Sequence, residues 1–261
     1  MTVGKSSRTP FKHWIINAEL GRLAGVFSHG SNKVPVKANP FVIYDLCAGD
    51  GANKDNSSPS IILKHTNFMR KNRVNVDVNL FEKSTNTFES LYLNFDGNDF
   101  NLVNKDSSDF ILNAKQNQAS FILIDPNNIS DLPVSEKMVN SFNSGTTFVI
   151  TLGCNVGGLK RLDIEERRLW FKSVELVIND IPKWHDAILV RLINDASQWA
   201  YLLRIPAAWT NKTMSNIQGV GNKFWPKNVK VTSLNQQYDD FRNELDILFL
   251  TKQERANKWK I

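Results

Sequence analysis

The sequence has little of several features that would point to particular protein classes. Its 261 residues include only two cysteines, Cys47 and Cys154, each at the end of an apolar run. One disulfide is chemically possible, but two cysteines do not make a framework, and we expect both to be reduced core residues. No Cys/His cluster has the spacing of metal ligands, so we expect no metal. The chain also has no internal repeat and no low-complexity segment.

Long apolar runs are absent as well. No stretch approaches the roughly 18 apolar residues of a membrane span, and residues 1–10 lack the apolar core of a signal peptide. We therefore expect no membrane association and a cytoplasmic protein. Hydrophobic residues make up 41% and charged residues 22% of the chain, which is ordinary for a globular protein with a buried core. The oligomeric state is not indicated.

The positive charge is concentrated in two segments. The formal net charge is +6, and residues 1–40 hold six basic residues against one acid, Glu19. Residues 204–230 hold five basic residues and no acid. This distribution favours a polyanionic partner such as nucleic acid, while simple solubility remains the alternative.

Strand-like and helix-like runs alternate along the chain. We expect strands at 41–46, 74–81, 100–103, 120–124, 146–152, 187–193 and 199–205, and helices at 11–27, 58–71, 85–95, 107–116, 134–142, 162–178 and 236–256. The last two strands would form a hairpin. Five βα units followed by a hairpin predict an α/β, Rossmann-like fold with a mostly parallel seven-stranded sheet, a C-terminal antiparallel hairpin and helices on both faces.

A glycine-containing loop directly after the first strand is the strongest motif. Its sequence is Asp45-Leu46-Cys47-Ala48-Gly49-Asp50-Gly51. Glycines there permit a sharp turn and close approach to a ligand, and ligands of open α/β sheets bind at the carboxyl ends of the strands. The loop resembles motif I of the class I S-adenosylmethionine-dependent methyltransferases, D-x-x-A-G-x-G. The resemblance implies that Asp45, Cys47, Ala48, Gly49 and Gly51 bind S-adenosylmethionine; an ordinary tight turn is the alternative.

Acids close the next two strands. Glu82 ends the second strand, where an acid can accept both ribose hydroxyl hydrogen bonds; a solvated surface acid would look the same. Asp106 ends the third strand. The resemblance implies that Asp106 and the Ser107 backbone meet the adenine ring, and a helix cap explains Asp106 equally well.

Asp125-Pro126-Asn127-Asn128 follows the fourth strand. It resembles motif IV of amino-methyltransferases, [D/N/S]-P-P-[Y/F/W], in which the first side chain and a proline carbonyl accept hydrogens from the target amine. Catalysis there is mostly positioning. Asn127 replaces the second proline and Asn128 the aromatic residue that stacks on a flipped base. An Asx-Pro turn is the alternative.

Two further resemblances concern the N-terminal half. Lys12-His13, the loop 45–51, Ser58-Pro59 and Asp125-Pro126 are similar to motifs of the three-Cys-motif partner family of methyltransferase-like proteins. Residues 8–14 faintly resemble the Pro-Phe-x-x-Trp start of DNA adenine N6-methyltransferases. That likeness implies an N-terminal region, 1–40, that closes over the cofactor site of a core, 41–205. Phe11 and Trp14 could equally pack in the core.

The remaining segment, 206–261, is expected to be a basic aromatic loop and a C-terminal helix packed on the same domain. Cations there can hold phosphates while rings stack on bases. The candidate substrate-binding residues are Lys12, Arg204, Trp209, Lys223 and Trp225, and the stacking ring could also be Trp184 or Phe224. Rings that fill the core under a basic surface are the alternative. His13 and His185 have no evident partner and are not expected to be general bases.

Together these features predict a methyltransferase that acts on nucleic acid, DNA rather than RNA, at adenine N6, with little sequence specificity. Few residues remain for reading base edges in the grooves. Two alternatives stay open: a methyltransferase for a protein or small molecule, and a binding module that kept the fold and lost the reaction.

Overall fold

The computed structural model describes residues 9–30, 40–53, 57–106, 120–125, 147–152, 163–179, 181, 183–193, 200–224 and 228–250. These residues fall into two units, the first ending at Asp125 and the second beginning at Thr147. The division lies inside the range 41–205 that the sequence suggested as one core. Cys154 and the helices expected at 107–116 and 134–142 lie outside the described residues.

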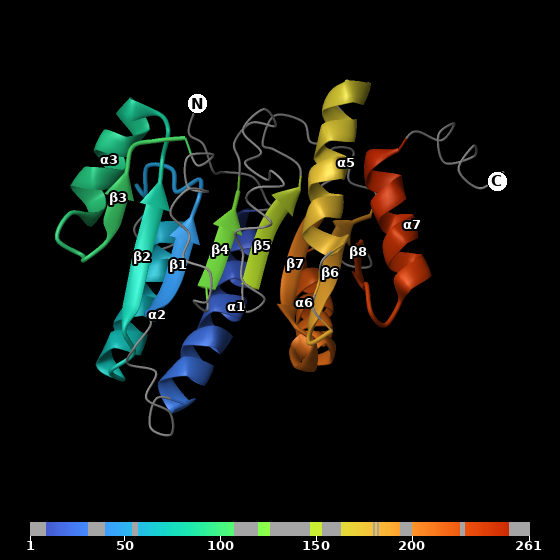
Figure 1. Cartoon of the computed structure of the whole chain (residues 1–261), viewed down its shortest axis with the longest axis horizontal. Helices are drawn as coiled ribbons and strands as arrows, with labels where there is room; N and C mark the ends of the chain where they lie inside the picture. Colours follow the sequence, from blue (N-terminus) through green and yellow to red (C-terminus); the bar gives the residue numbers. More distant parts are fainter. Residues whose placement is uncertain are drawn as a thin grey trace. The chain divides into compact units, whose positions relative to one another are not determined.

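The first unit holds parallel strands in the order β3-β2-β1-β4 (Figure 1). The strands are β1 (Phe41–Asp45), β2 (Val76–Phe81), β3 (Asn101–Val103) and β4 (Ser120–Ile124). All five residues of β4 are buried, as expected for a parallel strand covered on both faces. The predicted positions of these strands are confirmed to within two residues.

Three helices belong to the first unit: α1 (Thr9–Gly30), α2 (Ser58–Lys71) and α3 (Thr85–Phe95). α1 packs against α2, and the His65 ring and the Asn17 side chain form a 2.9 Å hydrogen bond between them. Ser57 caps α2 by accepting from the Ser60 N–H, and Pro59 lies in its first turn. Ser84 precedes α3 as expected but makes no side-chain cap hydrogen bond.

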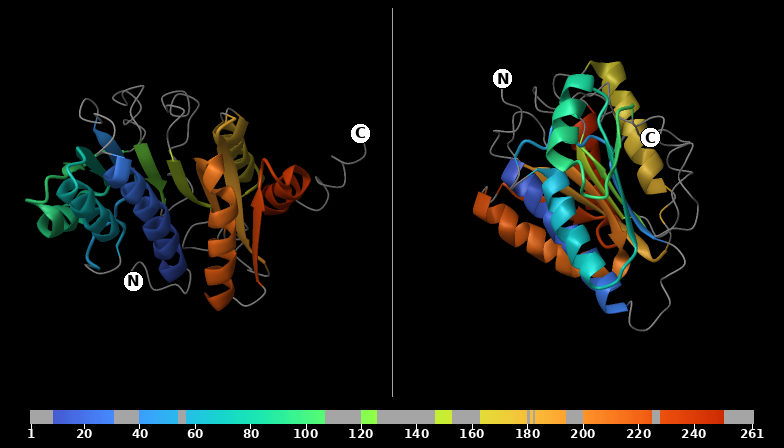
Figure 2. Two further views of the ribbon diagram at one scale, coloured as in Figure 1. Left: turned by 90° about the horizontal axis from the view of Figure 1, so that it is seen from below. Right: turned by 90° about the vertical axis from the view of Figure 1, so that its left-hand side faces the viewer.

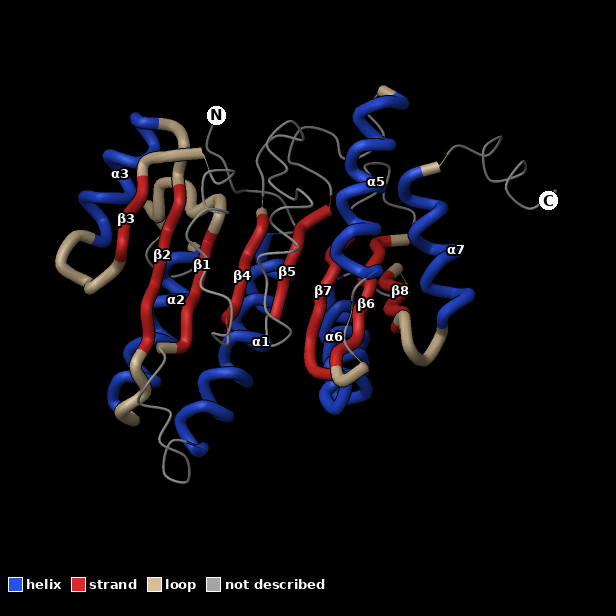
Figure 3. The backbone as a smooth tube through the Cα atoms, in the orientation of Figure 1, coloured by secondary structure: helices blue, strands red, loops and turns tan. Residues whose placement is uncertain are grey.

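The second unit holds antiparallel strands in the order β5-β7-β6-β8 (Figure 3). They are β5 (Thr147–Leu152), β6 (His185–Leu192), β7 (Ala200–Pro206) and β8 (Val229–Ser233). The expected pairing of β6 with β7 is confirmed. Helix α5 (Ile164–Asn179) lies on the opposite face of these strands from α6 (Thr210–Phe224), and α7 (Tyr238–Phe249) packs on α5 (Figure 2).

Two predictions for the C-terminal third were wrong. Residues 207–224 do not form a loop, because the short 3₁₀ helix η4 (Ala207–Trp209) leads into α6. The buried face of α6 consists of Thr210, Thr213, Ile217 and Gly221. These residues recur at helical spacing, but only one is a large apolar residue, so apolar periodicity does not reveal the helix. Strand β8 raises the number of described strands to eight, against the seven expected.

Candidate active site

Strand register brings three of the predicted site residues to one edge of the first unit. Asp45, the last residue of β1, pairs with Leu80 of β2 and Leu123 of β4. Two residues after these three paired positions, the chain reaches Cys47, Glu82 and Asp125, respectively. The carboxyl ends of parallel strands therefore place the three motifs side by side, as the sequence predicts.

The loop after β1 is held between the neighbouring strands by its own backbone. The Leu46 N–H donates to the Leu123 carbonyl at 3.0 Å, and the Ala48 N–H donates to the Phe81 carbonyl at 2.9 Å. Gly49 then has φ +67°, and the space where its Cβ would lie is open. The loop thus turns sharply and leaves room beside its backbone, which is what close approach of a ligand requires.

Gly51 has a different role from Gly49. Its φ is +62°, and a Cβ there would overlap the Phe95 ring of α3. The Asn94 side chain of the same helix donates to the Asp50 carbonyl at 3.1 Å. α3 therefore supports the far end of the loop, a role that no motif in the sequence indicated.

Glu82 connects two segments through one carboxylate. Oε2 accepts from the Gly49 N–H at 3.1 Å, and Oε1 accepts from the Ser84 N–H at 2.8 Å. The side chain is half-buried. Glu82 is therefore a positioned acid beside the glycine loop, and the alternative of a solvated surface acid does not describe it.

Asp45 is a fully buried carboxyl group at the start of the loop. Its Oδ1 accepts from the Cys47 N–H at 3.2 Å, whereas Oδ2 has no hydrogen-bond partner among the described residues. Burial raises the pKa of Asp45 to about 7, and the Asp125 charge adds to the rise, while the Ser58 side chain, the Cys47 N–H and Lys12 oppose it. A buried carboxylate oxygen without a partner is costly, so it marks a place for a donor.

Asp125 forms an ion pair with Lys12, whose Nζ donates to Oδ2. Both side chains are about one-fifth exposed. The neighbouring His13 has its pKa lowered to about 4, first by burial and then by Lys12. It is therefore neutral at pH 7. The sequence suggested Lys12 as a contact to substrate, and its pairing with Asp125, 113 positions away, was not anticipated.

The Cys47 thiol is held in its neutral form. Burial raises its pKa well above the ordinary value, and the charges of Asp45, Asp125 and Glu82 add to this. A raised pKa disfavours the thiolate, which is the nucleophilic form of cysteine. In the part of the chain that the structure describes, no group of three His, Cys, Asp or Glu side chains is placed to hold a metal ion.

Asp106 lies beyond the end of β3 and is about half exposed, with the Lys83 ammonium 3.7 Å away. Ala48 is buried. Ser107, Pro126, Asn127 and Asn128 lie outside the described residues. The predicted cofactor residues that the structure describes thus come from one loop and two further strand ends.

The other predicted substrate residues belong to the second unit. Arg204 is only 4% exposed; its Nε donates to His185 Nδ1 at 3.4 Å, and its guanidinium carbon lies 5.5 Å from the Phe148 ring centre. A guanidinium packed this way does not extend to a phosphate outside, so we do not carry Arg204 into the substrate set. Trp209 lies in η4 and is half-buried, Lys223 is exposed on the last turn of α6, and Trp225 lies outside the described residues.

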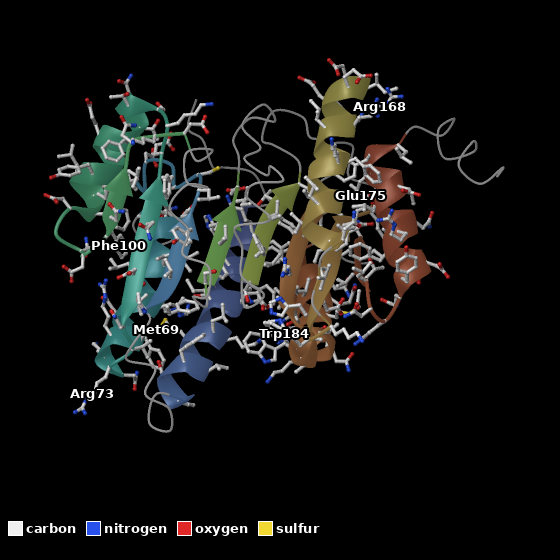
Figure 4. All side chains as sticks on the ribbon, viewed as in Figure 1. Met69, Arg73, Phe100, Arg168, Glu175 and Trp184 are labelled. Atoms are coloured by element: carbon white, nitrogen blue, oxygen red, sulfur yellow. The ribbon has the colours of Figure 1, made fainter. Side chains whose placement is uncertain are left out.

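Trp184, labelled in Figure 4, is half exposed. Its ring meets the His185 ring edge-on, with 4.2 Å between ring centres. Burial, followed by the Arg204 charge, lowers the pKa of His185 to about 4. His185 is therefore a neutral, buried ring. This agrees with the expectation that it is not a general base.

Comparison with known proteins bears on the fold. No protein-family model matches the chain, and no curated protein matches it in sequence. Protein LPL1258 from Legionella pneumophila has a similar structure over 89% of this chain and 97% of its own, with TM-score 0.54 and 12% identity. This likeness shows the fold alone, the Rossmann-like α/β arrangement described above.

Two weaker likenesses are an rRNA methylase from Streptococcus thermophilus and a putative caffeoyl-CoA O-methyltransferase from Staphylococcus aureus. The first has TM-score 0.41 and 10% identity, over 64% of this chain and 87% of that one. The second has TM-score 0.44 and 10% identity, over 72% of this chain and 83% of that one.

None of the described helices is long and apolar enough to cross a bilayer.

Proposed function

We propose that this chain is an S-adenosylmethionine-dependent methyltransferase. One observation carries the proposal: the buried Asp45 Oδ2 has no partner among the described residues, at the start of a loop whose Gly49 borders open space. An aminoacyl ammonium group would supply the donor that this oxygen lacks. A sulfonium nucleoside carries such a group together with a ribose and an adenine.

The residues around the loop fit the rest of that molecule. Glu82 lies at the end of β2, the strand next to β1. Its carboxylate can accept ribose hydroxyl hydrogens in place of one of the two backbone N–H groups, of Gly49 and Ser84, that it now binds. Asp106 follows the next strand and would accept a hydrogen bond from the adenine amine, and the Ser107 backbone N–H would donate to the adenine ring. Asp45 would bind the ammonium while the backbone of Ala48 and Gly49 lies against the ligand.

The acceptor side of the site is assigned to Asp125. The bound cofactor would supply a methyl group activated by its sulfonium. Asp125 accepts an N–H of the acceptor amine, and the Pro126 carbonyl accepts the other. Together they would aim the nitrogen lone pair at the methyl carbon; the N–C bond would form as the S–C bond breaks, a neutral thioether would leave, and the amine proton would pass to solvent. This is catalysis by orientation, and it needs no thiolate or imidazole base.

We assign the acceptor to nucleic acid, specifically adenine N6 of DNA. The support is chemical: a carboxylate that accepts N–H hydrogens suits an exocyclic amine, and the basic segments 1–40 and 204–230 suit a polyanion. Lys212 and Lys223 are exposed basic residues of α6 that are available for phosphate contact, and Trp209 and Trp225 are the candidate stacking rings. Asn127 and Asn128 leave the position of the usual stacking ring without an aromatic side chain.

The test is transfer of a tritiated methyl group from S-adenosylmethionine to DNA, RNA and protein in parallel. We expect label in DNA adenine, and a loss of about 100-fold or more in the Asp125→Ala variant, which removes the acceptor oxygen. Asp96→Ala, at an exposed acid after α3, is the matched control and should keep full activity. Label only in RNA, protein or a small molecule would overturn the acceptor. Calorimetry that detects no cofactor binding at millimolar concentration would overturn the methyltransferase itself.

A further inference from the structure

Lys12 presents the Asp125 carboxylate with an ammonium group, the same kind of donor that an acceptor amine would present. Its Nζ donates to Oδ2 of Asp125. A carboxylate has two oxygens, so one remains for another donor. An ion pair on one oxygen fixes the rotation of the carboxyl group, and this fixes the direction in which the second oxygen accepts.

The backbone of Lys12 is itself held in place. It lies in the first turn of α1, next to Phe11, which is fully buried, as are Ile15 and Ile16 one turn later. α1 is docked on α2 by the contact of His65 with Asn17. Lys12 is therefore delivered to Asp125 by a packed helix, and its ammonium is shielded from solvent enough to resist screening by salt.

The charges around this pair are mostly negative. Asp45 and Cys47 lie at the end of β1, Glu82 at the end of β2 and Asp125 at the end of β4, while α1 contributes Lys12 and His13. His13 is neutral at pH 7 because burial lowers its pKa to about 4. Among these groups Lys12 alone is positive, and it acts on both Asp45 and Asp125. Without it the two carboxyl groups would repel each other across the site.

We propose that Lys12 is a positioning residue for methyl transfer: its ammonium holds Oδ2 of Asp125 so that Oδ1 accepts the N–H of the acceptor amine. The inference rests on the proposed function. It differs from the direct substrate contact that the sequence suggested for Lys12. A direct contact to nucleic acid would affect the affinity for the substrate, whereas a positioning residue affects the rate of transfer.

The experiment compares wild type, Lys12→Met and Lys12→Arg, with kcat and KM measured separately. We expect Lys12→Met to lower kcat by about 10-fold or more while KM for DNA stays nearly unchanged. Lys12→Arg should restore most of the rate, because it keeps the charge. Lys64→Met, at an exposed residue of α2, is the control. A loss confined to KM for DNA, or no recovery of kcat in Lys12→Arg, would overturn the proposal.

A second measurement does not depend on activity. In carbon-13 NMR spectra of labelled aspartate carboxyl groups at pH 7, with Asp125→Asn to assign the signal, the chemical shift of the Asp125 carboxyl carbon should change in Lys12→Met and not in Lys64→Met. An unchanged chemical shift overturns the pairing whether or not the protein transfers methyl groups. If the wild type transfers no methyl group but the chemical shift changes, the proposed function fails while the Lys12–Asp125 ion pair stands.

Discussion

The Gly49 N–H and the Glu82 carboxylate are joined by a 3.1 Å hydrogen bond that ties the loop after β1 to the end of β2. The other oxygen of the same carboxylate holds the Ser84 N–H before α3. One side chain thus sets the position of the glycine loop and of the next helix. Its removal should disturb the loop and any ligand that the loop holds.

Glu82→Gln keeps the shape of this side chain and removes its charge. Because hydrogen bonds to a charged group are worth about 1.5–3 kcal/mol, we expect cofactor affinity to fall by about 10-fold or more. Isothermal titration calorimetry with S-adenosylmethionine measures this. Glu89→Gln, an exposed residue of α3, provides the comparison and should bind as the wild type does. Equal affinities for wild type and Glu82→Gln would remove Glu82 from the site.

Gly49→Ala and Gly97→Ala form a matched pair. Both glycines have positive φ, +67° and +84°, and both face open space at the Cβ position. Each substitution should therefore cost about 1–2 kcal/mol of unfolding free energy through backbone strain alone, as measured by urea denaturation. Only Gly49→Ala should weaken cofactor binding, because its methyl group would enter the space beside the loop. If both variants bind equally well, that space does not hold the ligand.

Gly51→Ala should destabilise the protein more than Gly49→Ala. The added methyl group suffers the same kind of strain and also overlaps the buried Phe95 ring, and such overpacking costs about 1–3 kcal/mol more. Phe95→Leu opens space at this contact. In a double-mutant cycle followed by urea denaturation, the two changes should therefore be less costly together than the sum of the single costs. Strict additivity would show that the loop moves away from α3 instead.

The buried Asp45 makes the free energy of unfolding fall as pH rises, which is the opposite of the usual effect of a carboxyl group. Because burial raises its pKa to about 7, the folded state keeps a proton that the unfolded state releases near pH 4. Its contribution is full below pH 4 and is lost as pH rises to about 7, at up to about 1.4 kcal/mol per pH unit. Asp45→Asn should remove this loss, so it should stabilise the protein at pH 8 more than at pH 5.

Denaturation of wild type and Asp45→Asn at both pH values gives the difference directly. His13 and His185 have their pKa values lowered to about 4, so they reduce the free energy of unfolding as pH falls below about 6.5. This pH dependence is opposite in sign to that of Asp45. Their effect is common to both proteins and cancels in the comparison. A constant difference between the two proteins from pH 5 to pH 8 would contradict a raised pKa for Asp45.

Much of the site could be predicted because parallel strands end at one edge. Once 41–46, 74–81 and 120–124 were recognised as neighbouring strands, Asp45, Glu82 and Asp125 had to lie near one another. The C-terminal third was harder, because the buried face of α6 is built largely from threonine and glycine and gives no apolar signal. The same limit applies to Arg204, since a basic residue in a basic segment is expected outside and here lies 4% exposed.

By itself the sequence determined the kinds of element and the chemistry placed at their ends, because strand and helix periodicity and turn residues act over a few positions. The tertiary structure alone decided which groups meet. Packing between distant segments pairs Lys12 with Asp125 and leaves one oxygen of Asp45 without a partner among the described residues. The same packing leaves open space beside Gly49 and places Phe95 against Gly51. No local pattern encodes such contacts, since they arise only when separate elements compete for the same volume.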